Sequence, residues 1–256
     1  MANLRLWKTI CLVCVFCAAA AIGSRAQTFT SIDVPGALGT FAYGINPAGA
    51  VTGTYFTTGV LFHGFLRAAN GTIATFDAPG AGTGSVQGTF AFGINLAGAI
   101  TGYYIDASNV NHGFVRAADG TLTSFDAPGA FHTFPNSIDP AGEITGHYLL
   151  SGSHGFVRAA DGTLTTFDAP GGATRTDPLQ CGYPCGPEIT TPASPSPRVN
   201  LAGVIAGDYQ DASSVFHGFL RGSDGTLSTF DAPGAGTGSG QGIFALSVNP
   251  QEAITG

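Results

Sequence analysis

Apolar residues alternate with polar or small residues in short runs, and glycine-rich turns separate these runs along most of the chain. In one stretch this pattern predicts four strands, at residues 42–46, 50–56, 63–68 and 72–78. The sequence NPAG separates the first two strands, and a three-residue loop ending in glycine separates the last two. Pro79 with Gly80 fits a type II turn after the fourth strand. The stretch is therefore predicted to be a four-stranded meander.

The same stretch returns three more times, with the third strand of each copy starting at His63, His112, His154 or His217. Units of roughly 40 to 50 residues with four strands each are typical of β-propeller blades. A β-solenoid is the alternative, although its coils are usually shorter and do not need two hairpin turns per repeat. The 39 glycines, 15 prolines and 10% charged residues also favour strands and turns over helices. We therefore expect an all-β fold, a β-propeller of four-stranded blades.

The two ends of the repeat region complement each other. TFTSIDVPG from Thr28 fits a fourth strand, and IFALSVNPQEAITG from Ile243 fits a first strand and part of a second. In a propeller these two segments would share a blade, which gives about five blades, the last of them incomplete. Because the sequence stops at Gly256 in the middle of the motif, we expect the natural protein to be longer.

The N-terminal segment has the features of a secretory signal peptide. Arg5 and Lys8 precede an apolar run at residues 10–22, and small residues ending at Ala26 fit a cleavage site. A membrane anchor is the alternative, but the run is shorter than the roughly 20 residues that a spanning helix needs. We expect a signal peptide at 1–26, a repeat domain at 27–256, a secreted or periplasmic protein, and no stable membrane anchor.

Charge and cysteine content narrow the classes of partner. The formal net charge is −7, and it becomes about −10 once the basic residues of the signal peptide are removed, which disfavours a nucleic-acid partner. Beyond the signal peptide only Cys181 and Cys185 remain, in CGYPC within an insert at 172–197. In an oxidising compartment we expect these two to form a disulfide, because two cysteines without a nearby His cannot complete a zinc site. We expect a monomer without cofactor or metal.

A histidine and an aspartate fourteen residues apart recur in every copy. With a three-residue loop between the third and fourth strands, counting back from Ala68 opposite Thr72 places His63 opposite Asp77. A catalytic site is usually a single asymmetric constellation, whereas a structural bond repeats with its unit, so we interpret the pairs as structural. The four pairs are His63 with Asp77, His112 with Asp126, His154 with Asp168, and His217 with Asp231.

Loop variation is confined to one end of the predicted meanders. The turns after the first and third strands are nearly uniform, whereas the connections after the second and fourth strands differ between copies. Because recognition usually lies in loops on a rigid scaffold, we expect ligand binding at the variable end. The candidates are Tyr104, Asp106 and Asp211, with Tyr183 at the tip of the insert. We find no motif of a nucleophilic hydrolase, zinc protease, P-loop or calcium loop.

The chain resembles the HAF repeat family, the probable extracellular repeats. The matching segments are GINPAGAVTG from Gly44, GINLAGAITG from Gly93, SIDPAGEITG from Ser137 and VNLAGVIAG from Val199, each followed by HGF. The resemblance implies secretion from a bacterium and a propeller-like repeat fold, but no reaction and no binding residues.

Three functional hypotheses follow. The first is a secreted, non-catalytic scaffold that binds a carbohydrate or a protein. The second is a hydrolase or lyase with a polar site on the variable end, and the third is a purely structural surface protein. An acidic pair near the axis would favour the enzyme, and exposed aromatic residues without one would favour binding.

Overall fold

The computed structural model describes residues 29–169, 198–245 and 247–256. The chain divides into a short first unit, Met1–Ile32, and a second unit, Asp33–Gly256, which contains all the strands. The expected signal peptide, Tyr183 and the expected Cys181–Cys185 disulfide lie outside the described residues. Within them every regular element is a β-strand, which confirms the all-β fold class. Consequently none of the described residues forms a helix that could span a membrane.

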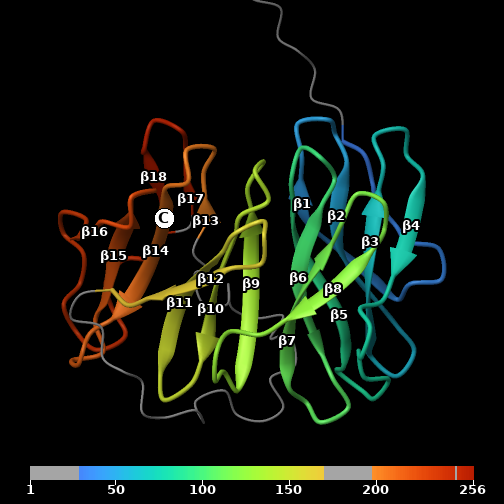
Figure 1. Cartoon of the computed structure of the whole chain (residues 1–256), viewed down its shortest axis with the longest axis horizontal. Helices are drawn as coiled ribbons and strands as arrows, with labels where there is room; N and C mark the ends of the chain where they lie inside the picture. The colour runs from blue at the N-terminus through green and yellow to red at the C-terminus, as the bar shows by residue number, and fades with distance from the viewer. Residues whose placement is uncertain (1–28, 170–197, 246) are drawn as a thin grey trace, which may run out of the picture. The chain divides into compact units, whose positions relative to one another are not determined.

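Four consecutive antiparallel meanders account for most of the strands (Figure 1). Meander 1 contains β1 (Gly39–Ile45), β2 (Val51–Thr57), β3 (Leu61–Arg67) and β4 (Ile73–Phe76). Meander 2 contains β5 (Gly88–Ile94), β6 (Ile100–Ile105), β7 (Asn111–Arg116) and β8 (Leu122–Phe125). Meander 3 contains β9 (His132–Ile138), β10 (Ile144–Leu149), β11 (Ser153–Arg158) and β12 (Leu164–Phe167). Meander 4 contains β13 (Arg198–Val199), β14 (Ile205–Gln210), β15 (Phe216–Arg221) and β16 (Leu227–Phe230), and β17 (Ser247–Val248) and β18 (Ile254–Thr255) follow.

The hairpin between the third and fourth strands fixes the register of each meander. In meander 1 the Ala68 N–H donates to the Thr72 carbonyl, and Gly71 has a φ of 90°, which favours glycine. Gly64 then lies opposite Phe76, whose ring leaves no room for a Cβ, because its Cε2 would be 2.6 Å away. The aromatic ring thus covers bare backbone, which is the arrangement that the three-residue loop predicts.

A short parallel contact ties each of two meanders to the segment that follows it. Phe62 of β3 pairs with Gly88 of β5, so meanders 1 and 2 share one eight-stranded sheet. Phe216 of β15 pairs with Gly242 in the same way, ahead of β17. These bridges are irregular extensions of the meanders, and antiparallel pairing within each meander still dominates.

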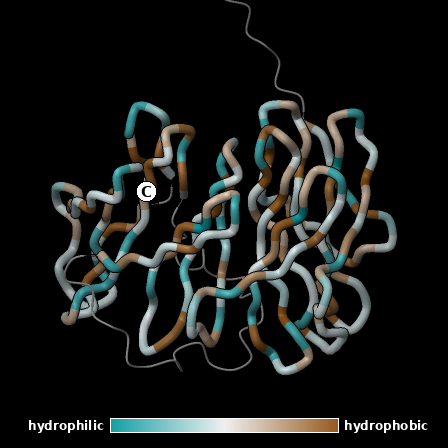
Figure 2. Tube along the Cα trace, viewed as in Figure 1, coloured by the Kyte–Doolittle hydropathy of each residue, from teal (hydrophilic) through white to brown (hydrophobic). Residues whose placement is uncertain are grey.

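Apolar side chains recur along the strands of every meander, interspersed with polar ones (Figure 2). Many of them pack between consecutive meanders. Phe114 of meander 2 is fully buried and contacts Phe76 of meander 1 edge to face, and Phe156 meets Phe125 in the same way one copy later. Arg116 also lies over the Phe76 ring at 5.2 Å, and Arg158 lies over the Phe125 ring at 4.8 Å. The cores of this fold are therefore the junctions between meanders.

Asparagine side chains link the same junctions near the turn after the first strand. The Asn46 Nδ2 group donates to the Asn95 carbonyl at 3.0 Å, and the Asn95 Nδ2 group donates to the Asp139 carbonyl at 3.0 Å. The Asn200 Nδ2 group donates to the Asn249 carbonyl at 2.8 Å. We call this series the amide ladder. Each link joins a side chain of one meander to the backbone of the next.

Candidate functional site

In each of the four meanders the histidine contacts the aspartate with which it was predicted to pair. Each Nδ1 atom is within hydrogen-bond distance of its aspartate, and each imidazole stacks on a tyrosine of the neighbouring strand. The aspartates remain about half exposed. The Nδ1 to carboxylate distances are 2.9 Å for His63–Asp77, 2.9 Å for His112–Asp126, 2.6 Å for His154–Asp168 and 2.8 Å for His217–Asp231.

The candidates at the variable end are engaged in their own loops. The Asp211 carboxylate accepts hydrogen bonds from the N–H groups of Ser213 and Val215, both at 2.8 Å, and lies 3.4 Å from His217 Nε2. The Val215 bond is the main cause that lowers the pKa of Asp211. Asp106 makes the equivalent contacts, and the buried Tyr104 stacks on His112. The structure therefore places Asp106 and Asp211 in separate loops, each bound to its own backbone.

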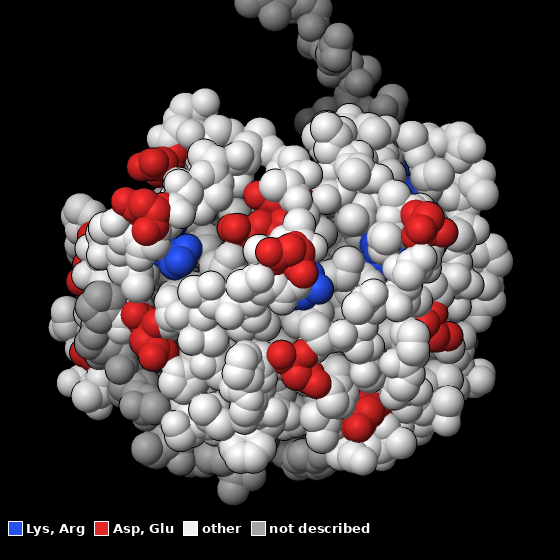
Figure 3. Space-filling view, in the orientation of Figure 1, with Lys and Arg blue, Asp and Glu red and all other residues white. Residues whose placement is uncertain are grey.

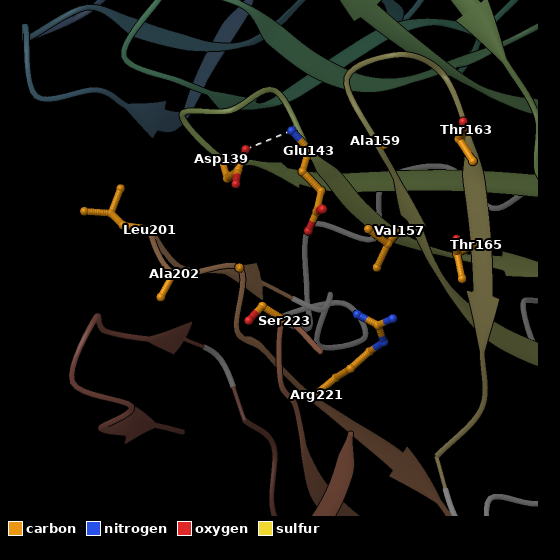
Figure 4. A pocket seen from close by; sticks show the side chains of 11 residues that line it. Asp139, Glu143, Val157, Ala159, Thr163, Thr165, Leu201, Ala202, Arg221 and Ser223 are labelled. Atoms are coloured by element: carbon orange, nitrogen blue, oxygen red, sulfur yellow. Dashed lines mark hydrogen bonds between the residues drawn. The ribbon is translucent and has the colours of Figure 1, made fainter. Parts of the chain in front are cut away.

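A groove of about 390 Å³ opens at the other end of the strands, between meanders 3 and 4 (Figure 4). The turns after the first and third strands of both meanders form it. The β9–β10 turn supplies Asp139 and Glu143, and β15 supplies Arg221. The remaining lining residues are Val157, Ala159, Thr163 and Thr165 from meander 3, and Leu201, Ala202, Gly203 and Ser223 from meander 4.

Asp139 interrupts the amide ladder at this groove. It occupies the position of Asn46, Asn95, Asn200 and Asn249 in the other copies. Its Oδ1 accepts the Glu143 N–H at 2.8 Å, just as Asn46 Oδ1 accepts the Ala50 N–H at 3.0 Å. An ionised carboxylate has no N–H to donate onward. In the described part of the chain, the link from meander 3 to meander 4 is therefore missing from the ladder.

Glu143 is a second departure in the same turn. The equivalent residues are Ala50, Ala99, Val204 and Ala253. Ala50 and Ala99 pack against the apolar cores of their junctions, and Val204 is buried. Glu143 instead directs a half-buried carboxylate into the groove (Figure 4). Burial is the main cause that raises the pKa of Glu143, and the Asp139 charge adds to it, whereas Arg221 opposes the shift.

Arg221 supplies the positive charge of the groove. Its guanidinium lies over Phe167 at 5.2 Å, as Arg158 lies over Phe125. Arg158 Nη1 also donates to the Ala159 carbonyl, but Arg221 Nε is buried and has no hydrogen-bond partner among the described residues. No ion pair within 4.0 Å joins the described Arg221 and Glu143. The groove therefore holds two carboxylates on one wall and, on the other, a guanidinium that forms no ion pair with any described residue.

Two further partly buried groups lie at equivalent positions on β10 and β14. His147 stacks on Phe134 at 4.7 Å, and burial lowers its pKa to about 4. Burial raises the pKa of Asp208 to about 8, and its Oδ1 has no hydrogen-bond partner in the described part of the chain. At the same position in meander 1, Thr54 accepts the Ala91 N–H at 3.1 Å. Both ionisable groups are therefore uncharged across part of the ordinary pH range.

The described residues contain no group of three or more His, Cys, Asp or Glu that could hold a metal ion. The face seen in Figure 3 carries scattered acidic side chains and few basic ones, without a basic patch.

The sequence analysis placed the candidate site among the variable loops and did not predict the groove. Its signal was present in DPAGE, where Asp139 and Glu143 both depart from the other copies.

Comparison with known proteins informs the fold alone. No protein-family model matches the chain, and no curated protein matches it. Among solved structures, TolB from Acinetobacter baumannii matches with a TM-score of 0.50 and 12% identity, over 76% of this chain and 43% of TolB. Virginiamycin B lyase from Staphylococcus aureus matches with a TM-score of 0.46 and 12% identity, over 84% of this chain and 68% of the lyase. The chain thus spans less than half of TolB, and both of these proteins are β-propellers.

Proposed function

We propose that this protein is a secreted, non-catalytic binding scaffold in which each meander is one blade of a β-propeller. Four copies of one antiparallel meander, packed through their faces, support this architecture over a solenoid. The fold likeness to TolB also supports it. The ligand, a carbohydrate or a protein, binds in the groove between meanders 3 and 4.

This proposal depends on one observation: Asp139 and Glu143 both differ from the residues at the same positions in the other copies of the repeat. Both residues replace ones that stabilise the other junctions, an amide that donates a hydrogen bond and a small apolar side chain that fills the interface. Partly buried carboxylates that face no cation within ion-pair distance among the described residues cost folding free energy, so folding alone does not favour them. Such locally unfavourable choices are typical of functional sites.

Binding is favoured over catalysis by the chemistry of the groove. Its described lining contains hydroxyl groups on Thr163, Thr165 and Ser223, but no His, Cys or Lys to act as base or nucleophile. The acidic pair of Asp139 and Glu143 and the raised pKa of Glu143 favour the alternative, a hydrolase or lyase with Glu143 as general base. Turnover of a bound ligand that E143Q abolishes would establish that alternative.

The test compares the chain with a variant that restores the repeat. The double variant D139N/E143A carries the residues of meander 2 at both positions, so we expect it to fold. Both proteins are screened on a glycan array and on an array of surface-protein peptides. We expect a ligand of the parent chain to bind the double variant at least tenfold more weakly, and D106N, at the variable end, to bind normally. Equal binding by the double variant would overturn the assignment of the groove.

A further inference from the structure

The charges in the groove face one another without pairing. Figure 4 shows the Glu143 carboxylate and the Arg221 guanidinium both directed toward the space between the meanders. They are close enough for Arg221 to oppose the rise in the Glu143 pKa, yet no described ion pair joins them. A ligand that inserts between them can therefore contact both groups at once.

Charge balance indicates what such a ligand carries. Asp139 and Glu143 lie on one wall and Arg221 on the other, and all three are at least half buried. Partly desolvated charges gain most from groups of opposite charge. An ammonium or guanidinium group would suit the acidic wall, and a carboxylate would suit the N–H groups along the edge of the Arg221 guanidinium. A neutral sugar could donate and accept hydrogen bonds here but would leave all three charges uncompensated.

The apolar part of the lining points in the same direction. It consists of small aliphatic side chains, among them Val157, Ala159 and Leu201, and Leu201 is 70% exposed. No aromatic ring belongs to the described lining, and Phe167 lies beneath the Arg221 guanidinium. Aliphatic walls suit the methylene stem of a Lys or Arg side chain, which packs along apolar surface while its charged end group stays in polar surroundings. The described lining therefore offers no flat aromatic surface on which a sugar ring could stack.

Resting on the proposed function, we propose that the groove binds a protein segment in which a basic and an acidic side chain are neighbours. The basic group binds between Asp139 and Glu143, and the acidic group pairs with Arg221. Thr163 of meander 3 and Ser223 of meander 4 also line the groove and can hydrogen-bond the backbone of the segment. The partner is thus a protein and not a polysaccharide.

The test is an NMR titration of the isotope-labelled chain with acetyl-Lys-Asp-amide. We expect saturable shifts of the backbone amides of Glu143, Gly203 and Ser223, and weaker binding as salt increases. E143Q and R221M should each weaken binding at least tenfold. R116M, which removes the equivalent arginine of meander 2, should leave it unchanged. R221K, which keeps the charge, guards against an effect of unfolding and should retain most of the binding.

The controls separate this inference from the proposed function. Acetyl-Gln-Asn-amide, which has the same shape without charge, should cause no shifts, and equal binding by it would overturn the inference. Maltose or cellobiose that shifts the groove amides, with no effect of the charged peptide, would also overturn it while leaving the groove as a binding site. If no probe shifts these amides, the inference fails, and the D139N/E143A screen then decides the proposed function separately.

Discussion

The junction between meanders 1 and 2 and the junction between meanders 3 and 4 are built from the same repeat, but the turn after the first strand differs between them. A parallel bridge also joins the strands of meanders 1 and 2, and the insert at 172–197 separates meanders 3 and 4 in the sequence. At the first, Ala50 packs against the core and Asn46 donates an amide to the next meander. At the second, Glu143 and Asp139 occupy these positions, and a groove opens. The strands and the stacked arginine are common to both. The difference teaches that a change in one turn of the repeat can accompany the change from a packed interface to a candidate binding site.

The largest expected effect concerns the cores of the two junctions. Phe114 is fully buried at the first junction, and Phe219 is 5% exposed at the second. Phe→Ala in a core typically costs about 3 to 5 kcal/mol. We expect F114A to reach that range and F219A to cost about 1 kcal/mol less, because the groove already loosens its surroundings. Urea unfolding monitored by fluorescence measures both, and an equal or larger cost for F219A would contradict the comparison.

The next effect concerns pH. The folded pKa of Asp208 is about 8, and its reference value is 3.8. The folded state therefore binds more protons than the unfolded state between these values, and stability falls as pH rises from about 4 to about 8. We expect D208N to be more stable than the parent chain by about 2 kcal/mol at pH 8.5, with little difference at pH 4. Thermal unfolding across this pH range measures the effect, and parallel pH profiles would disprove it.

The next pair of variants exchanges the residue types at one position of the amide ladder between a regular junction and the groove. N95D removes the donor to the Asp139 carbonyl at a regular junction, and D139N supplies the missing donor at the groove. We expect N95D to cost about 1 to 2 kcal/mol and D139N to stabilise by about 1 kcal/mol, since one buried hydrogen bond is lost or gained. Chemical denaturation reports both values. If D139N were neutral or destabilising, the missing link would not be a weakness of the junction.

The smallest expected effect concerns the His–Asp pairs, which do not line the groove. The hydrogen bond that the protonated His217 ring donates to Asp231 is the main cause that raises the pKa of His217. This pair therefore stabilises the fold at low pH and loses its contribution as pH rises through that pKa. We expect D231N to cost about 0.5 kcal/mol at pH 5 and less at pH 9. D77N should behave alike at pH 5, because its pair has the same geometry at a regular position. A cost that appears only in meander 4 would show that the groove influences the pair.

Turn length and strand patterns in the sequence predicted much of this fold, but they predicted little of the candidate site. The three-residue loop is enough to bring His63 opposite Asp77, because register in a hairpin depends on the turn alone. The groove depends on how neighbouring meanders pack, and no local pattern encodes that packing. Asp106 and Asp211 seemed available in variable loops, yet they bind their own backbone, as aspartates in turns commonly do. The signal peptide and the disulfide remain predictions.

The amide ladder has a consequence for how such a chain can evolve. Every link uses a side chain of one copy and a backbone carbonyl of the next, and a carbonyl is present whatever residue carries it. A newly duplicated copy can therefore join the series without a matching mutation in its neighbour. By the same logic, a copy that loses its asparagine disturbs a single boundary. Gene duplication supplies interchangeable parts, and one of them, as at Asp139, is free to acquire a new role while the rest keep the fold intact.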